Sequence, residues 1–154
     1  MKTVLTGIKA TGMPHLGNYL GAIKPAIDSI DGNNRCLFFI ADYHALTSIR
    51  DPKLFKEYAY EGAAVWLALG LDPAKAIFYK QSSIPEVFEL AWILSCLTSK
   101  GDMNRAHSYK DKVQKNINKG VAPDKDINMG LYNYPILMSS DILLFDTDRV
   151  PVGK

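Results

Sequence analysis

The sequence predicts an α/β fold, a Rossmann-like parallel sheet with flanking helices, and two observations carry this prediction. Three short runs are rich in β-branched and aromatic residues and are bounded by Gly, Asp or Pro, as buried parallel strands are; they cover residues 3–6, 37–40 and 76–79. A helical pattern of apolar residues follows each run, which is the alternation that βαβ units produce. With 154 residues, of which 47% are hydrophobic and 22% charged, the chain is expected to form one core.

The helices are expected between and after these strands, all three of which should be central and buried. The first helix should kink at Pro25, and the second should begin at Pro52, which suits a first turn, and end at Gly70. A polar, Lys-rich stretch is expected to form one basic surface helix that ends at Gly120, and the segment 146–153 is expected to be a fourth strand edge. In chain order, the expected helices span residues 17–30, 52–69, 85–98, 101–120 and 129–144.

The composition argues against several kinds of protein. The net charge of +2 is too small to indicate nucleic-acid binding by itself, and the Lys-rich segment 100–125 is most simply a solvated helix face. Cys36 and Cys96 lie in apolar runs, so both are expected to be buried, reduced thiols, and the three histidines are too scattered for a metal site. The N-terminus lacks a signal-like apolar stretch, so a cytoplasmic protein without a membrane partner is expected.

The turn after the first strand has the chemistry of an anion site. It leads into a helix N-terminus, whose free N–H groups and positive dipole end favour phosphate. Gly7 and Gly17 lack a Cβ, so a flat base or a phosphate could approach the backbone there, and His15 and Asn18 add side-chain donors. From this stretch alone, a helix capped by Asn18 with His15 on the surface is equally consistent. The spacing is not the G-x-G-x-x-G of dinucleotide sites.

A wider set of motifs carries a family resemblance. His15-Leu16-Gly17-Asn18 resembles the HIGH signature of class I aminoacyl-tRNA synthetases, in the variant that ends in asparagine, and a Gly-x-x-x-[Ser/Thr]-Gly turn precedes it at residues 7–12. A single H-x-G-N is a poor motif, but an ordered set of downstream segments is similar to the tryptophanyl-tRNA synthetase family over essentially all 154 residues. These segments are 41–45, 69–73, 81–82, 134–144 and 147–153.

The resemblance implies that the first turn holds ATP, with His15 and Asn18 as the catalytic residues. Thr11 can replace the serine hydroxyl of the family turn, whereas Lys9 adds a charge to which the resemblance assigns no role. The ATP-binding residues that the resemblance implies are Lys9, Ala10, Thr11, His15, Gly17, Asn18, Gly153 and Lys154.

The resemblance also implies a tryptophan pocket. Indole has one polar group, an N–H that only donates, so a selective site needs a fixed acceptor in an apolar slot. By resemblance, Asp141 is that acceptor, Tyr134 meets the amino group of the substrate, and His44 lies near the ring. From the residues alone, Asp141 could equally be a polar residue on the exposed face of a helix. The implied tryptophan-binding residues are Leu5, Gly7, His44, Tyr134, Met138, Asp141, Val150 and Val152.

The function implied is a tryptophan–tRNA ligase, which uses ATP to form tryptophanyl-adenylate from L-tryptophan and then charges tRNA(Trp). Mg²⁺ would come with ATP rather than occupy a protein-only metal site, and the protein would be a homodimer. The KMSKS region and the anticodon-binding domain of the family are absent from residues 1–154, which would be an incomplete catalytic domain with a helical insertion at about 84–128. Such an N-terminal fragment is expected to be nearly inactive alone, and the basic segment 110–128 has no assigned role.

Three alternatives stay open. A tyrosyl-tRNA synthetase has the same fold, although the helix of Asp141 followed by Val-Pro-Val-Gly favours tryptophan. A small adenylyltransferase also uses an H-x-G-[H/N] turn, but it should carry a late Ser/Thr-rich turn for phosphate, which this sequence lacks. A non-enzymatic module descended from the synthetase would bind tryptophan without consuming ATP.

Overall fold

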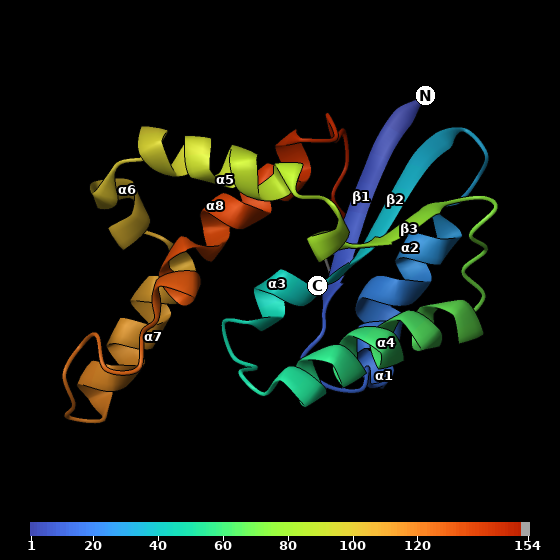
Figure 1. The fold of residues 1–154 in the computed structure, drawn as a ribbon. Helices are drawn as coiled ribbons and strands as arrows, with labels where there is room; N and C mark the ends of the chain where they lie inside the picture. The colour runs from blue at the N-terminus through green and yellow to red at the C-terminus, as the bar shows by residue number, and fades with distance from the viewer. Residues whose placement is uncertain (152–154) are drawn as a thin grey trace.

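The structure of the chain, a computed structural model that describes residues 1–151, contains a parallel three-stranded sheet flanked by helices (Figure 1). This confirms the predicted Rossmann-like α/β fold. The sheet order is β1-β2-β3, and Gly7 lies opposite Phe39 in the register of β1 and β2. The strands are β1 (Lys2–Lys9), β2 (Asn34–Ala41) and β3 (Ile77–Lys80).

The two edges of the sheet differ from the prediction. β3 pairs only with β2 among the described residues, and Ile77 is 48% exposed, so the expectation that all three strands are central is wrong for β3. On the other side of β1, the segment after α8 runs parallel through one bridge between Val4 and Arg149, and the amide of Leu5 donates to the Arg149 carbonyl at 2.9 Å. The expected fourth strand edge is therefore a single bridge as far as residue 151, and the rest of it lies outside the described residues.

The core covers both faces of the sheet. On one face, α2 (Lys24–Asp28) and α4 (Pro52–Ala68) pack against β1 and β2. Trp66 of α4 and Phe38 of β2 are fully buried with their ring centroids 5.4 Å apart, and burying each ring contributes about 2 kcal/mol. On the other face, Phe39 and its neighbours pack against Ile142 and Phe145. The helix predicted from Pro52 is thus confirmed and anchors the sheet.

The first predicted helix is not one regular helix. It consists of α1 (Leu16–Asn18), a π-helical turn η1 (Tyr19–Ile23) and α2. The N–H of Lys24 donates to the carbonyl of Tyr19, five residues earlier. Pro25 lies in the first turn of α2, where its missing N–H is tolerated, so a widened turn replaces the expected kink.

Two short helices follow the carboxyl ends of β2 and β3. α3 (Asp42–Ala45) continues directly from β2, and the 3₁₀ turn η2 (Gln81–Ser83) continues directly from β3. Asp42 and Gln81 are fully buried, and Asp42 accepts a hydrogen bond from the amide of Ser82 at 3.0 Å. These contacts tie the ends of β2 and β3 together.

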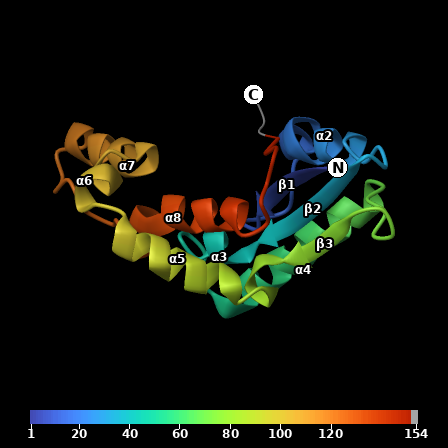
Figure 2. The ribbon, with the colours of Figure 1, turned by 90° about the horizontal axis from the view of Figure 1, so that it is seen from above.

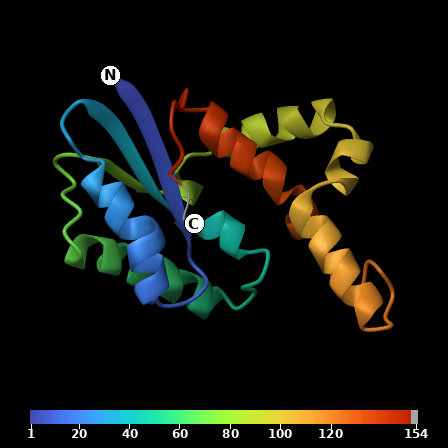
Figure 3. The ribbon, with the colours of Figure 1, turned by 180° about the vertical axis from the view of Figure 1, so that it is seen from behind.

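The remaining helices form a group beside the sheet (Figure 3). They are α5 (Glu86–Leu97), α6 (Lys100–Asn104), α7 (His107–Asn118) and α8 (Met129–Leu143). α5 packs along α8, and α6 and α7 lie at the end of α8 away from the sheet (Figure 2).

The prediction of a single basic helix over 101–120 is wrong, because the segment forms two helices, α6 and α7, with a non-helical connection between them. Ala106 has extended backbone angles, and Met103 turns inward to become buried. Asn116 is also buried, and its amide donates to the carbonyls of Pro123 and Lys125 at 2.8 and 2.7 Å. The segment is therefore a folded hairpin with its own buried groups rather than one solvated face.

The two thiols differ in exposure. Cys36 of β2 is buried as expected, whereas Cys96 of α5 is exposed, so the prediction is wrong for Cys96. The apolar run around Cys96 lies on a helix that packs against α8 on one face only, and this leaves the thiol on the outer face. Among residues 1–151, no helix combines the length and apolar character that crossing a membrane requires.

Candidate active site

Two adjoining cavities lie at the carboxyl ends of the strands, where parallel α/β sheets hold ligands. The larger, of about 450 Å³, lies between β1, β2, α3 and α8 and reaches Ser108 of α7. The smaller, of about 200 Å³, lies along the turn from residue 10 to residue 15 that joins β1 to α1. Lys9, the last residue of β1, lines both cavities, so the two spaces meet at its side chain.

The larger cavity brings together the described residues for which the sequence predicts tryptophan binding. β1, α3, α8 and the segment beside β1 contribute them, although they lie far apart in the chain. Val152, the remaining one, lies outside the described residues. The residues that line the cavity are Leu5, Gly7, His44, Tyr134, Met138, Asp141 and Val150.

Asp141 is the buried anion of this cavity. Its side chain is almost fully enclosed, which overturns the alternative of an exposed polar position on α8. The amide nitrogen of Gln81 donates to both carboxylate oxygens at 2.9 Å, and Nε2 of His44 lies 2.9 Å from Oδ2. Because a carboxylate only accepts, this contact places a proton on Nε2 of His44. Two carboxylate oxygens offer about four acceptor sites, so capacity for one more donor remains.

Sequence reasoning assigned no role to Gln81, which is fully buried. Gln81 also contacts α3, because its side-chain oxygen Oε1 accepts a hydrogen bond from the backbone amide of His44 at 3.4 Å. The sequence indicates Gln81 in two ways, by its place in segment 81–82 of the family resemblance and by its position directly after the third predicted strand, at the ligand-binding edge of a parallel sheet. Nearby, burial and then the charge of Asp141 raise the pKa of the Tyr79 hydroxyl well above its ordinary value, so that side chain stays neutral.

Three hydroxyl groups that the sequence did not single out also line the larger cavity. Oγ of Ser108 lies 2.7 Å from the hydroxyl of Tyr134, which joins α7 to α8 at the cavity wall. Thr6 donates to the carbonyl of Pro151 at 3.3 Å, and Thr47 accepts from the ammonium of Lys9 at 2.8 Å. These hydroxyl groups add polar atoms to the wall of a cavity that is otherwise lined mainly by apolar side chains.

The turn after β1 combines helix capping with donor groups. Nδ1 of His15 accepts from the amides of Gly17 and Asn18 at 3.1 and 3.4 Å, and Oδ1 of Asn18 accepts from the amide of His15 at 3.0 Å. This is a reciprocal capping box in which His15, not Asn18, is the N-cap. Because Nδ1 accepts, a neutral His15 carries its proton on Nε2, and Asn18 keeps its amide hydrogens. Capping and donation to a ligand are therefore compatible.

The residues for which the sequence predicts ATP binding divide into two sets. Gly17 belongs to the turn but does not line the smaller cavity, and Gly153 and Lys154 lie outside the described residues. Those that line the cavity are Lys9, Ala10, Thr11, His15 and Asn18.

The glycines of this region accommodate side chains of the protein itself. A Cβ on Gly7 would lie 2.5 Å from the ring of Phe39, and a Cβ on Gly17 would lie 2.9 Å from the ring of His15. These contacts within the protein already require glycine at positions 7 and 17, and the approach of a base or a phosphate there stays a prediction. The ring of Phe39 lies over β1 because residue 7 lacks a side chain.

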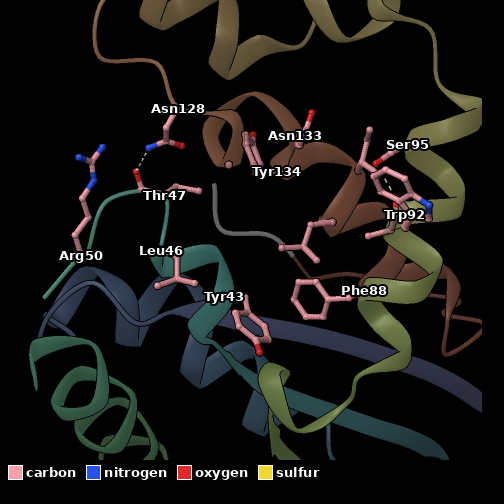
Figure 4. A pocket seen from close by; sticks show the side chains of 14 residues that line it. Tyr43, Leu46, Thr47, Arg50, Phe88, Trp92, Ser95, Asn128, Asn133 and Tyr134 are labelled. Carbon is pink, nitrogen blue, oxygen red and sulfur yellow. Dashed lines mark hydrogen bonds between the residues drawn. The ribbon is translucent and has the colours of Figure 1, made fainter. Parts of the chain in front are cut away.

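A third cavity, of about 590 Å³, lies between α3, α5 and α8 (Figure 4). Tyr43 and Phe88 meet edge to face in its wall, with ring centroids 4.3 Å apart, and Trp92 lies in the same lining. Tyr134 and Thr47 line both this cavity and the larger of the two at the strand ends. The third cavity holds none of the other residues that the sequence predicts to bind a ligand.

Comparison with known proteins agrees with this geometry. A family model described as tRNA synthetases class I (W and Y) matches residues 1–154. The tryptophan–tRNA ligase of Bordetella pertussis is 56% identical over 152 residues, which are 98% of this chain and 34% of the relative. That of Neisseria meningitidis is 52% identical over 99% of this chain and 46% of the relative. The chain thus spans between a third and a half of the length of these relatives.

Solved structures have the same fold. The tryptophanyl-tRNA synthetase of Campylobacter jejuni, complexed with ADP and tryptophan, superposes with a TM-score of 0.85 at 48% identity over 99% of this chain and 45% of that one. A tyrosyl-tRNA synthetase from Archaeoglobus fulgidus superposes with a TM-score of 0.68 at 21% identity, which shows the likeness of fold alone. From its fold and from a family match along its whole length, this chain belongs to the class I tRNA synthetases of the tryptophan and tyrosine group.

Proposed function

We propose that this chain supplies the amino-acid pocket and the first nucleotide-binding turn of a tryptophan–tRNA ligase. The observation that carries the proposal is Asp141, a buried acceptor held by Gln81 and His44 in the wall of a cavity of about 450 Å³. Relatives named tryptophan–tRNA ligase, at 49 to 56% identity, and the tryptophan complex of the C. jejuni enzyme support this choice of amino acid.

Selection of tryptophan follows from how the indole N–H is satisfied. Asp141 has an acceptor position left after its contacts with Gln81 and His44, and an indole that fills the cavity can donate to it. An amino acid with a purely apolar ring would leave that buried position without a donor, and discrimination on such grounds is far stronger than discrimination by shape. In the wall of the same cavity, the hydroxyls of Tyr134 and Ser108 suit the amino group of the substrate.

The smaller cavity suits the triphosphate of ATP. His15 and Asn18 face it with N–H groups that the capping box leaves available, and donors aimed at a phosphate stabilise the charge that develops during transfer. The tryptophan carboxylate attacks the α-phosphorus, a carboxylate–phosphorus bond forms, and the bond to the leaving pyrophosphate breaks. The carboxylate is already a nucleophile, so the reaction needs no general base, and positioning carries the catalysis.

Mg²⁺ would enter with the nucleotide. Residues 1–151 hold no cluster of three or more His, Cys, Asp or Glu side chains arranged as metal ligands. Its ligands would therefore be phosphate oxygens and water, a mode that Mg²⁺ prefers, and it would neutralise charge on the leaving group.

We also propose that the protein acts as a homodimer in the cytoplasm, where it charges tRNA(Trp). The surface of α5 supports the proposal of a homodimer, because its side chains Trp92, Ile93 and Leu97 are 72, 55 and 78% exposed. Several large apolar side chains exposed on one helix mark an interaction surface, and a second copy of the chain is the partner we propose. The basic residues of α7 receive no role.

The test is tryptophan-dependent exchange of labelled pyrophosphate into ATP by the longest product of the gene and by residues 1–154. We expect exchange with tryptophan and not with tyrosine in the former, and at least ~10³-fold less in residues 1–154, which lack the KMSKS region of the family. Tyrosine-only exchange would establish the tyrosyl alternative. Exchange that needs no amino acid would indicate an adenylyltransferase, and tryptophan binding without exchange would indicate a non-enzymatic module.

A further inference from the structure

Lys9 occupies a unique place among the described residues, because it alone lines both cavities at the carboxyl ends of the strands. It is the last residue of β1, so its side chain leaves the sheet where the two spaces meet. Under the proposed function, this junction is where the carboxylate of tryptophan must reach the α-phosphate of ATP. A cation is thus positioned between two anionic reactants.

The charge of Lys9 has no counterpart in the described part of the protein. No Asp or Glu oxygen among residues 1–151 lies within 4.0 Å of its ammonium. Partial burial lowers the pKa of the Lys9 ammonium, which is the opposite of what an acidic partner would do. Asp141, the buried carboxylate of the larger cavity, is engaged by Gln81 and His44 instead. The ammonium is therefore available to anions that enter the site.

The position of the ammonium is set by the protein. Nζ of Lys9 donates to Oγ1 of Thr47 at 2.8 Å, and that hydroxyl donates to the carbonyl of His44, also at 2.8 Å. His44 in turn contacts Asp141. Thr47 thus anchors the Lys9 ammonium to the backbone of His44, the residue whose ring contacts the carboxylate that we assign to the indole N–H. One of the three ammonium hydrogens is used by Thr47, and two remain for ligands.

We propose that the Lys9 ammonium bridges the carboxylate of tryptophan and the α-phosphate of ATP and is a catalytic residue of adenylate formation. This inference rests on the proposed function and gives the charge of Lys9, a residue expected only to contact ATP, a role in the reaction. Without a cation between them, the carboxylate and the phosphate repel one another as they approach. Lys9 keeps its proton throughout: the carboxylate oxygen forms the new bond to phosphorus, and the electron pair of the broken bond leaves with pyrophosphate.

The experiment compares Lys9→Gln and Lys9→Arg in the longest product of the gene. Lys53→Gln is the matched control, because Lys53 is exposed on α4 and lines neither cavity. We expect Lys9→Gln to lower kcat of pyrophosphate exchange by at least ~100-fold, as loss of a charge-stabilising donor does, and Lys9→Arg to retain at least about a tenth of it. The control should exchange like the unchanged protein.

Binding measurements separate this role from a structural one. Titrations use tryptophan and tryptophanol, which lacks the carboxylate. Lys9→Gln should weaken the binding of tryptophan about tenfold and leave that of tryptophanol within about threefold, since only tryptophan has a carboxylate for Lys9. Equal weakening of both ligands, or a kcat within about threefold of the unchanged protein, would overturn the proposal for Lys9. Absence of tryptophan-dependent exchange in the unchanged protein would instead overturn the proposed function.

Discussion

The side-chain amide of Gln81 donates to both carboxylate oxygens of Asp141 at 2.9 Å, and both residues are buried. The pair joins the end of β3 to α8, and in the chain these two elements are separated by α5, α6 and α7. An amide is neutral, and one of its hydrogens can point between the two oxygens, so Gln81 holds the carboxylate without adding a second charge. The acceptor that we assign to the indole N–H therefore has a fixed place before any ligand enters.

Changing Gln81 tests this relationship. Gln81→Met removes the Nε2 donor from both oxygens and should cost about 2 kcal/mol in the free energy of unfolding, because Asp141 keeps only His44. Gln81→Glu places a second carboxylate against Asp141 and should cost more near neutral pH. Its pKa would be raised by burial and by Asp141, so the stability deficit should shrink as the pH falls from 8 to 5. Urea unfolding across that range measures the effect, and a deficit that grows on acidification would contradict it.

Asp141 should determine the affinity for tryptophan and leave the affinity for ATP unchanged. In the longest product of the gene, Asp141→Ala should raise the KM for tryptophan at least ~10-fold and leave the KM for ATP nearly unchanged, because only the indole N–H loses its acceptor. Pyrophosphate exchange with each substrate varied in turn gives both constants. Asp28→Ala, which removes an exposed carboxylate paired with Lys24, is the control. A parallel loss for both substrates would mean damage to the fold.

Gly7 should tolerate no side chain. Gly7→Ala would place a Cβ 2.5 Å from the Phe39 ring, and Phe39 is held from its other side by Tyr79, with stacked ring centroids 5.4 Å apart. Overpacking of this kind lowers the free energy of unfolding by about 2 kcal/mol. The displaced ring would also narrow the cavity of about 450 Å³ that Phe39 lines. Thermal unfolding and tryptophan titration measure the two effects.

The control for that substitution is Gly21→Ala in η1, where an added Cβ meets nothing within 4 Å. Helix propensity should make this variant as stable as the unchanged chain or more so. If the two alanine variants unfold at the same temperature, the close approach of Phe39 to β1 does not explain the glycine at position 7.

The two cysteines should react at very different rates. Cys96 is exposed and should react with an aromatic disulfide reagent within minutes, whereas Cys36 is buried and burial raises the pKa of its thiol, so its reactive thiolate is scarce. We expect one equivalent of reaction in the folded chain and a second after unfolding. Cys96→Ser should abolish the fast phase and Cys36→Ser should preserve it; two fast equivalents would be inconsistent with the buried position of Cys36.

Local patterns in the sequence predicted the elements whose formation depends on local chemistry. The strand containing Leu37 to Ile40 and the helix that begins at Pro52 follow from side-chain composition and from the first-turn preference of proline, and both are present, the helix with Asp51 as its N-cap. The family resemblance led to residues that the fold then collects around one cavity, from Leu5 to Val150. Their roles toward ligands stay predictions.

What the sequence did not predict depends on contacts between distant segments. Gln81 acquires its role only when η2 and α8 meet, 60 residues apart in the chain. The exposure of Cys96 depends on which face of α5 packs against α8, and an apolar run does not specify that face. The π-helical turn before Pro25 is one of several ways to tolerate a missing N–H, and tertiary packing decides among them.

The capping box at the start of α1 has a consequence for what the turn can recognise. His15 and Asn18 direct their lone pairs inward, to backbone amides, and keep their hydrogens for the cavity. Nδ1 of His15 has no lone pair left and Oδ1 of Asn18 has one, so the two side chains together offer a ligand more donors than acceptors. We therefore expect this turn to favour groups that are rich in oxygen lone pairs over groups that only donate.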